Sequence, residues 1–183
     1  MANLSHVVLV GLPGVGKSTV GRAVAERLKR GFIDLDTKIE RSSGKTISRI
    51  FNEDGEAVFR KAEADVSAAV AELAPSVIAP GGGWVLNSPA VAHLLGNSRI
   101  IYLRVTPDAA IRRMGRGIRR RPLLTGAHDP YEAMRAIYEA RKAKYEECAQ
   151  MTVETGGVGK SNVIAKVVEL VLAAERDFAN END

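Results

Sequence analysis

A glycine-rich run near the amino terminus constrains the fold more than any other part of this 183-residue chain. Residues Gly11–Thr19 read G-L-P-G-V-G-K-S-T and match the pattern G-x-x-x-x-G-K-[ST] of a phosphate-binding loop. The apolar run His6–Val10 before it is typical of a buried parallel strand, and Ser18–Arg30 after it has the apolar periodicity of a helix. Because strand, loop and helix follow in the order that a phosphate site requires, a chance glycine-rich turn is the weaker interpretation.

The loop also predicts how the phosphates of a nucleotide are held. Its glycines let backbone N–H groups face the β- and γ-phosphates, and the helix N-terminus adds partial positive charge. We expect Lys17 to reach the terminal phosphates and Ser18 to ligate Mg²⁺. The loop residues expected to bind the nucleotide are Gly14, Val15, Gly16, Lys17, Ser18 and Thr19.

A second run, Gly156–Ser161, also ends in G-K-S between a predicted strand and a predicted helix. The first glycine of the pattern would fall on Glu154, whose carboxylate would oppose a phosphate. We interpret this run as a flexible turn beside the adenine rather than as a second phosphate loop.

Strand-like and helix-like segments alternate along the whole chain, which predicts an α/β fold: a five-stranded parallel sheet with helices on both faces. The length suits a single domain, residues 1–183. The predicted strands are His6–Val10, Phe32–Asp36, Ser76–Ala79, Arg99–Val105 and Met151–Glu154. The predicted helices after the first are Thr37–Ser43, Thr46–Asn52, Glu56–Leu73, Pro89–Leu95, a helix that starts at Pro107 with Thr106 as its cap, Tyr131–Ala149 and Asn162–Phe178.

Basic residues give the chain a net charge of +4, and much of the excess lies in one arginine-rich window. The arginines of this window are Arg112, Arg113, Arg116, Arg119, Arg120 and Arg121. No aromatic residue interrupts them, so the stacking platforms typical of single-stranded nucleic-acid binding are missing there. Nucleotide phosphates explain the cluster better than nucleic acid does, and two or three of the arginines belong to a solvated basic face.

The segment of about 114–129 loses periodicity and is rich in glycine, proline and arginine. A stretch of this length without secondary structure inside a compact domain is usually a functional lid or a disordered segment. We predict a mobile lid.

Composition also bounds the location and the partners. The single cysteine, Cys148, cannot form an internal disulfide, which agrees with a reducing cytosol. No apolar run approaches the length needed to span a bilayer, and the first residues lack the basic region of a signal peptide. We expect a cytoplasmic protein without membrane or nucleic-acid partners. Its small size makes a monomer the default expectation.

Several polar or flexible features fall at the carboxyl ends of the predicted strands, where open α/β sheets bind ligands. Asp34 and Asp36 are two residues apart on a segment predicted to be extended, so both side chains should point the same way. One carboxylate can hold Mg²⁺ through water, and the other can orient a substrate hydroxyl or take its proton. A helix cap is the alternative role for Asp36. The triplet Gly81–Gly83 permits close approach of a ligand to the backbone, or it is a simple hinge.

The chain resembles the shikimate kinase family, within the nucleoside-monophosphate-kinase-like P-loop fold, from about Val7 to Val171. The segments that carry the resemblance are Gly11–Thr19, Phe32–Asp36, the pattern I-F-x-x-x-G-E-x-x-F-R-x-x-E over residues 50–63, Gly81–Gly83 and the R-P-L-L run at 121–124. The phosphate loop alone is shared by many nucleotidases, whereas the combination is specific.

The resemblance implies ATP-dependent phosphorylation of the 3-hydroxyl of shikimate, with Mg²⁺ as cofactor, in the biosynthesis of aromatic amino acids. It implies that residues of about 34–63 form a helical substrate-binding region. The residues implied to bind shikimate are Asp36, Arg60, Gly81, Gly82, Gly83 and Arg141, with Phe51, Phe59, Pro122 and Leu123 around its ring. Arg60 and Arg141 would clamp the carboxylate of the substrate, which suits a forked guanidinium.

For the chemical step, the resemblance implies that Lys17, Asp36 and Arg121 are catalytic. Arg113 and Arg121 would also contact ATP, with Arg113 stacked on the adenine and Arg121 at the transferring phosphoryl group. The metal site would be formed by Ser18 and Asp34.

Two departures from the family pattern and several rival functions stay open at this stage. Trp84 stands where most relatives carry a small residue, so we expect it to narrow or reshape the rear of the pocket. The run at 156–160 lacks the arginine often found in the adenine loop of the family. The rival functions are a gluconate or nucleotide kinase of the same fold, a nucleic-acid-binding NTPase and a non-catalytic ATP-binding regulator.

Overall fold

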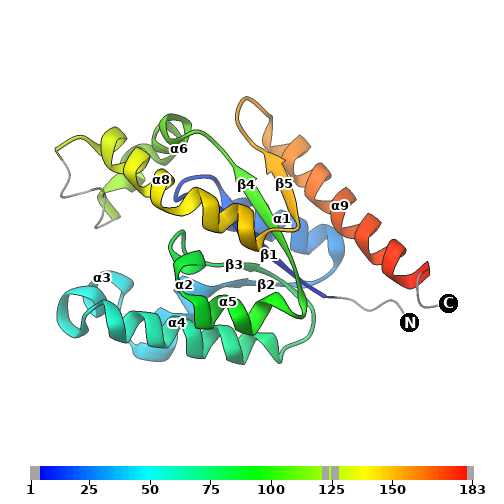
Figure 1. Cartoon of the computed structure of the whole chain (residues 1–183), viewed down its shortest axis with the longest axis horizontal. Helices are drawn as coiled ribbons and strands as arrows, with labels where there is room; N and C mark the ends of the chain where they lie inside the picture. Colours follow the sequence, from blue (N-terminus) through cyan, green and yellow to red (C-terminus); the bar gives the residue numbers. More distant parts are fainter. Residues whose placement is uncertain (1–4, 121–123, 125–127, 181–183) are drawn as a thin grey trace.

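The computed structural model describes residues 5–120, 124 and 128–180, and its centre is a parallel sheet of five strands. The strands lie in the order β2-β3-β1-β4-β5 (Figure 1). Their bounds are β1 His6–Val10, β2 Gly31–Asp34, β3 Ser76–Ala79, β4 Ser98–Arg104 and β5 Met151–Glu154. Every paired neighbour is parallel, which confirms the predicted five-stranded parallel sheet.

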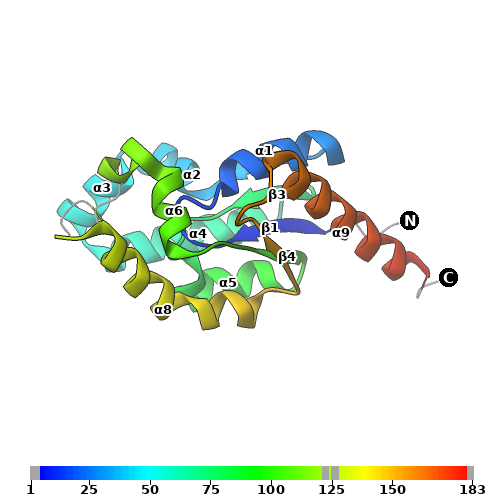
Figure 2. The same ribbon diagram turned by 90° about the horizontal axis from the view of Figure 1, so that it is seen from above.

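Helices cover both faces of this sheet, as predicted. Figure 2 shows α1 and α9 on one face and α5 and α8 on the other. The longer helices are α1 Lys17–Leu28, α2 Leu35–Ser43, α4 Glu56–Ala71, α5 Ser88–Leu95, α6 Pro107–Met114, α8 Pro130–Cys148 and α9 Lys160–Asn180. The short ones are α3 Ile47–Arg49, the π-helix η1 Ile50–Asp54 and the 3₁₀ turns η2 Trp84–Leu86 and η3 Gly115–Arg120. No helix in the described ranges is long and apolar enough to cross a membrane.

The central strand β1 explains where a ligand can bind. All of its residues are buried, and it lies between β3 and β4. The next two strands of the chain, β2 and β3, lie on one side of it, and the later strands β4 and β5 lie on the other. Ligands of open α/β sheets bind outside the carboxyl ends of the strands at such a switch point. The glycine-rich loop Gly11–Gly16 follows β1 at this point.

Residues of the segment of about 34–63 form a second, smaller apolar cluster. Ile39, Ile50 and Phe59 form its centre, with exposed fractions of 5% or less. Phe51 lies at its margin, with its ring centroid 4.6 Å from that of Phe59. This cluster joins α2, η1 and α4 into one unit that flanks the end of β2.

One expectation about this region is wrong. The strand predicted over Phe32–Asp36 ends at Asp34, and α2 begins at Leu35, so Asp34 and Asp36 do not lie on one extended segment. The side chain of Asp34 accepts a hydrogen bond from the backbone N–H of Thr37 at 3.2 Å. Asp34, rather than Asp36, is therefore the cap of this helix, and Asp36 lies in its first turn.

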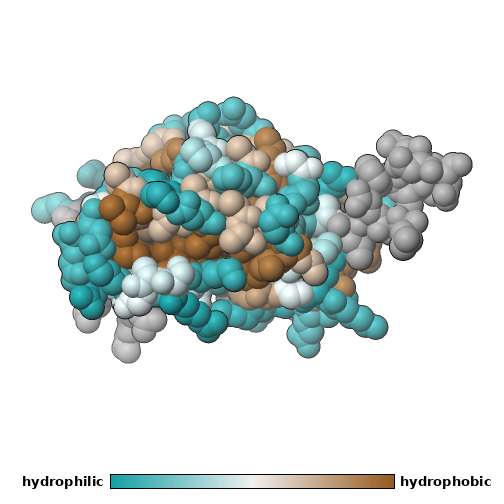
Figure 3. Space-filling model, turned by 90° about the horizontal axis from the view of Figure 1, so that it is seen from below, coloured by the Kyte–Doolittle hydropathy of each residue, from teal (hydrophilic) through white to brown (hydrophobic). Residues whose placement is uncertain are grey.

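An apolar band crosses the face seen from below, with hydrophilic residues along its borders (Figure 3). Large apolar side chains that remain exposed in the described chain include Val58, Leu73, Leu86 and Leu95. Folded domains commonly expose such side chains, so they carry no functional conclusion.

Candidate functional site

The loop between β1 and α1 has the backbone of an anion-binding site. Gly14 and Gly16 have φ values of 83° and 104°, in the region that disfavours any side chain, and Gly16 caps α1. A Cβ on Gly14 would lie 2.6 Å from the side chain of Met114 and 2.7 Å from the carbonyl oxygen of Ala110. The loop therefore packs directly on α6, and no larger residue fits at Gly14.

Two side chains at the start of α1 carry the polar chemistry of this loop. The Lys17 ammonium donates to the carbonyl oxygens of Gly11 and Leu12 at 2.8 and 3.1 Å. The Ser18 hydroxyl donates to the Asp34 carboxylate at 2.7 Å. A hydroxyl and a carboxylate beside a phosphate loop match the way proteins bind Mg²⁺, which takes few protein ligands and completes its shell with phosphate oxygens and water.

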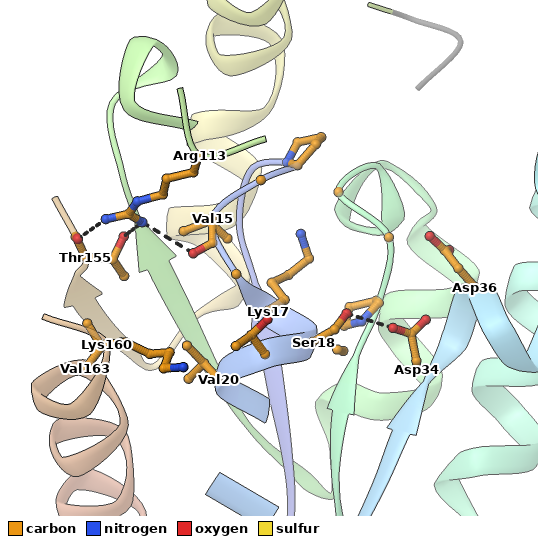
Figure 4. Close-up of a pocket in the computed structure, with 18 of the residues that line it drawn as sticks. Val15, Lys17, Ser18, Val20, Asp34, Asp36, Arg113, Thr155, Lys160 and Val163 are labelled. Atoms are coloured by element: carbon orange, nitrogen blue, oxygen red, sulfur yellow. Dashed lines mark hydrogen bonds between the residues drawn. The ribbon is translucent and has the colours of Figure 1, made fainter. Parts of the chain in front are cut away.

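A cavity of about 760 Å³ opens over the loop (Figure 4). Its floor is the loop and the first turn of α1, and one wall is the acidic pair Asp34 and Asp36. The opposite wall is formed by Arg113 and by residues of the turn after β5. From that turn and the start of α9, the lining residues are Thr155, Val158, Lys160 and Val163. The G-K-S run after β5 thus forms a turn and the start of α9, and it lies beside the same cavity as the phosphate loop.

Arg113 ties this wall to the loop. Its guanidinium donates to the Thr155 hydroxyl at 2.9 Å and to the Val15 carbonyl at 3.4 Å, and it also bonds the Thr155 carbonyl (Figure 4). Sequence reasoning missed Thr155. Its only signal was its position directly after a predicted parallel strand.

A smaller cavity of about 150 Å³ adjoins the first. Its charged lining is Asp36, Arg60, Glu63 and Arg141, and its apolar lining includes Phe51 and Phe59. Four residues line both cavities: Pro13, Asp36, Gly81 and Gly82. The phosphate loop and the arginine-lined hollow therefore open onto one cleft, and Asp36 lies where its two parts meet.

Arg60 is held by two carboxylates. Its guanidinium bonds Glu63 at 2.9 Å and Glu56 at 3.1 Å, and it donates to the Gly83 carbonyl at 3.3 Å. The Glu63 carboxylate is buried and also accepts from the Asn87 amide at 2.9 Å. A buried charge needs such partners, so Glu63 fixes Arg60 at the cavity wall and Asn87 fixes Glu63.

The glycine triplet brings the remaining polar groups together. A Cβ on Gly83 would lie 3.2 Å from the Arg60 guanidinium and 3.6 Å from that of Arg141, so both cations converge there. A Cβ on Gly81 would lie 2.8 Å from the Asp36 carboxylate. The triplet thus lies beside all three charged side chains that were predicted to bind an acceptor, and the absence of a Cβ makes this approach possible.

Comparison with known proteins agrees with this geometry. The sequence model of the shikimate kinase family matches residues 13–172. A shikimate kinase of Thermobifida fusca is 44% identical over 155 residues, which cover 85% of this chain and 88% of that protein. The chain belongs to the shikimate kinase family.

Solved structures support the same membership. A shikimate kinase from Acinetobacter baumannii in complex with shikimate superposes with a TM-score of 0.88 and 34% identity, covering 94% of this chain and 96% of that one. A gluconokinase from Sinorhizobium meliloti superposes with a TM-score of 0.64 at 16% identity, a likeness that shows the P-loop kinase fold alone.

The departure from the family pattern at Trp84 has a different consequence from the one predicted. Trp84 does not line either cavity; it is fully buried in the main core. Its indole N–H donates to the Ser67 hydroxyl at 3.1 Å, and that hydroxyl donates to the Glu63 carbonyl at 2.8 Å. Trp84 therefore belongs to the core behind the shikimate kinase cleft and does not form its wall.

Some predicted positions cannot be compared with the structure. Arg121, Pro122 and Leu123 lie outside the described residues. Of the R-P-L-L run, Leu124 is described, and it is buried at the edge of the small cavity.

Proposed function

We propose that this chain transfers the γ-phosphoryl group of ATP to the 3-hydroxyl of shikimate, giving 3-phosphoshikimate and ADP. One observation carries the proposal. The cavity over the phosphate loop and the smaller cavity lined by Arg60 and Arg141 meet at Asp36. A phosphoryl donor in the first and a cyclic acid in the second would thus have their reacting atoms side by side.

Phosphoryl transfer depends on alignment and on neutralising charge, more than on covalent help from the protein. On the donor side, we propose that the backbone of Gly14–Thr19 and the Lys17 ammonium hold the β- and γ-phosphates. Arg113, which lines the same cavity, would contact the adenine. The Lys17 ammonium donates to two carbonyls of the loop, which keeps it within the site.

Ser18 and Asp34 are the proposed residues for Mg²⁺. When bound, the ion would neutralise charge on the phosphates. The 2.7 Å contact between the two side chains keeps both oxygens at the edge of the phosphate loop. Because Asp34 also caps α2, its carboxylate is oriented before any metal arrives.

On the acceptor side, we propose that Arg60 and Arg141 bind the carboxylate of shikimate. A guanidinium fork suits a planar carboxylate, and both guanidinium groups converge beside Gly83. Phe51 and Phe59 would contact the apolar part of the ring. Asp36 would bind ring hydroxyls and direct the attacking oxygen toward the γ-phosphate, either as a general base or as an orienting acceptor.

We extend the proposal to the parts of the molecule that lie around the cleft. The chain would act as a single domain, with a lid over about 114–129 that brings Arg121 to the transferring phosphoryl group and excludes water. It would act as a cytoplasmic monomer, without nucleic-acid or membrane partners. The excess of basic residues near Arg113 would then bind a small polyanion rather than a nucleic acid.

Identification of the product tests the proposal. Purified protein is incubated with ATP, Mg²⁺ and shikimate, and the product is analysed by phosphorus and proton NMR. We expect one new phosphate ester whose phosphorus couples to the proton on carbon 3. A phosphate on another hydroxyl, or release of inorganic phosphate without an ester, would contradict the proposed reaction.

A further inference from the structure

The glycine triplet is held in place by hydrogen bonds to all of its carbonyls, and the bond to the middle carbonyl, that of Gly82, comes from a distant helix. Two of the carbonyls accept from N–H groups of the turn that follows. These bonds run from Trp84 to Gly81 at 3.1 Å and from Leu86 to Gly83 at 3.0 Å. The carbonyl of Gly82 accepts instead from the hydroxyl of Tyr145, on α8, at 2.5 Å.

The bond from Tyr145 sets the direction of the next N–H group in the triplet. In a planar trans peptide the C=O and the following N–H point in opposite directions, and no peptide bond in the described chain is cis. Tyr145 is 1% exposed, so it draws the Gly82 carbonyl toward the interior of the protein. The N–H of Gly83 is thereby turned away from the interior, and Gly83 is one of the residues that line the small cavity.

The same turn of α8 also supplies Arg141. Residues four apart on a helix share a face, and Arg141 and Tyr145 both reach the triplet. The Tyr145 ring is itself fixed because it stacks on Tyr102 of β4, with ring centroids 5.1 Å apart and planes inclined by 21°. The sheet, the helix and the glycine loop are thus connected through one phenol.

We propose that Tyr145 is a positioning residue for the acceptor: its hydroxyl orients the Gly82–Gly83 peptide so that the loop and the Arg141 guanidinium face the small cavity together. The proposal rests on the proposed function, because the acceptor is taken to be shikimate. Tyr145 lines neither cavity and is not expected to touch the substrate. Sequence reasoning missed it.

The protonation of Tyr145 suits this role. Burial raises the pKa of Tyr145 to about 12, an effect that the nearby Arg141 guanidinium partly opposes. The hydroxyl therefore keeps its proton throughout the range in which a cytoplasmic enzyme works, and it remains a donor to the Gly82 carbonyl.

Tyr145→Phe tests the proposal, and Tyr102→Phe is its matched control. Both changes remove one buried phenol hydroxyl from the same pair of stacked rings. The Tyr102 hydroxyl has no hydrogen-bond partner among the described residues, whereas the Tyr145 hydroxyl bonds Gly82. The comparison thus isolates the bond to the loop from the general effect of losing a hydroxyl.

Steady-state kinetics and a binding titration provide the readouts. For Tyr145→Phe we expect the KM for shikimate to rise about 3- to 10-fold, the range that follows from one net hydrogen bond, with the KM for ATP unchanged. Trp84 is the only tryptophan of the chain, and its backbone N–H bonds Gly81 of the triplet, so its fluorescence can report shikimate binding without ATP. The dissociation constant should rise by the same factor as KM.

A second variant tests whether Tyr145 and Arg141 act through one element. Arg141→Lys keeps the charge and loses the fork, so it should raise the KM for shikimate by itself. If both residues orient the same loop, the double variant should raise KM by less than the product of the single effects. A full product of the two effects would contradict joint action.

The outcomes separate this inference from the proposed function. An equal KM for shikimate in Tyr145→Phe and Tyr102→Phe would overturn the inference, even if thermal unfolding showed that Tyr145→Phe is less stable. A wild-type protein that does not phosphorylate shikimate would overturn the proposed function and this inference with it.

Discussion

A methyl group at Gly81 should disturb Asp36 and little else. The Cβ of an alanine there would lie 2.8 Å from one carboxylate oxygen of Asp36. Because the optimal separation of such atoms is about 3.5 Å or more, the carboxylate must move by roughly 0.7 Å. The backbone of Gly81 has no positive φ, so the substitution itself introduces no backbone strain.

A displacement of this size should affect turnover more than folding. A misplacement of about 1 Å can cost on the order of 10²-fold in rate, so we expect Gly81→Ala to lower kcat roughly 10- to 100-fold. Gly96→Ala is the control, because a Cβ at Gly96 meets nothing within 4 Å. The assay measures kcat with saturating ATP and shikimate, with thermal unfolding of both variants alongside. A kcat for Gly81→Ala equal to that of Gly96→Ala would refute the placement of Asp36 at the reacting oxygen.

Further substitutions test the other proposed roles. Arg60→Ala should raise the KM for shikimate at least about tenfold through loss of a charge-assisted contact, and an unchanged KM in initial-rate assays would contradict the carboxylate clamp. Arg121→Ala should fold normally, which circular dichroism would check, and it should lose most turnover. The reason is that an arginine at a transferring phosphoryl group raises the rate roughly 10³- to 10⁵-fold in P-loop GTPases. Equal kcat values for the variant and the wild type would remove Arg121 from the mechanism. Ser18→Ala should raise the Mg²⁺ concentration needed for half-maximal rate about tenfold, since one ligand is lost, whereas an unchanged requirement would exclude Ser18 from the metal site. Burial raises the pKa of the Cys148 thiol to about 11 from its ordinary 9.0, so the stability that the neutral thiol contributes is complete below pH 9.0 and is lost as pH rises through 11. Alkylation of Cys148 near neutral pH should accordingly be much slower in the folded protein than in denatured protein, and equal rates would count against that pKa.

The sequence predicted the sheet because its strands are short, apolar and separated by helical periodicity. All of the residues of β1 and β3 are buried, which is the condition that produces uninterrupted apolar runs. The end of β2 was harder to predict. Leu35 is fully buried, and an apolar residue at that point fits the last position of a strand or the first of a helix equally well. The cap from Asp34 to Thr37 decides in favour of the helix.

The acceptor part of the cleft shows where sequence reasoning ends. Asp36, Arg60 and Arg141 are far apart in the chain, and a family resemblance brought them together before any geometry was available. The residues that hold these three side chains and the glycine triplet in place could not be predicted in that way. Whether Trp84 faces a cavity or the core depends on the 3₁₀ turn that follows the triplet. The bond from Tyr145 to Gly82 joins residues 63 positions apart, and helical spacing reveals only that Tyr145 shares a face with Arg141.

The most direct test of the central claim is the rate of ADP release with a panel of acceptors. The claim is that the phosphate loop and the hollow lined by Arg60 and Arg141 form one cleft that is selective for a cyclic polyhydroxy acid. Coupled assays would compare shikimate, gluconate and nucleoside monophosphates at equal concentration, with a sample lacking any acceptor as the baseline. We predict ADP release well above the baseline with shikimate alone. A higher rate with gluconate or with a nucleoside monophosphate, or one rate regardless of acceptor, would contradict the claim.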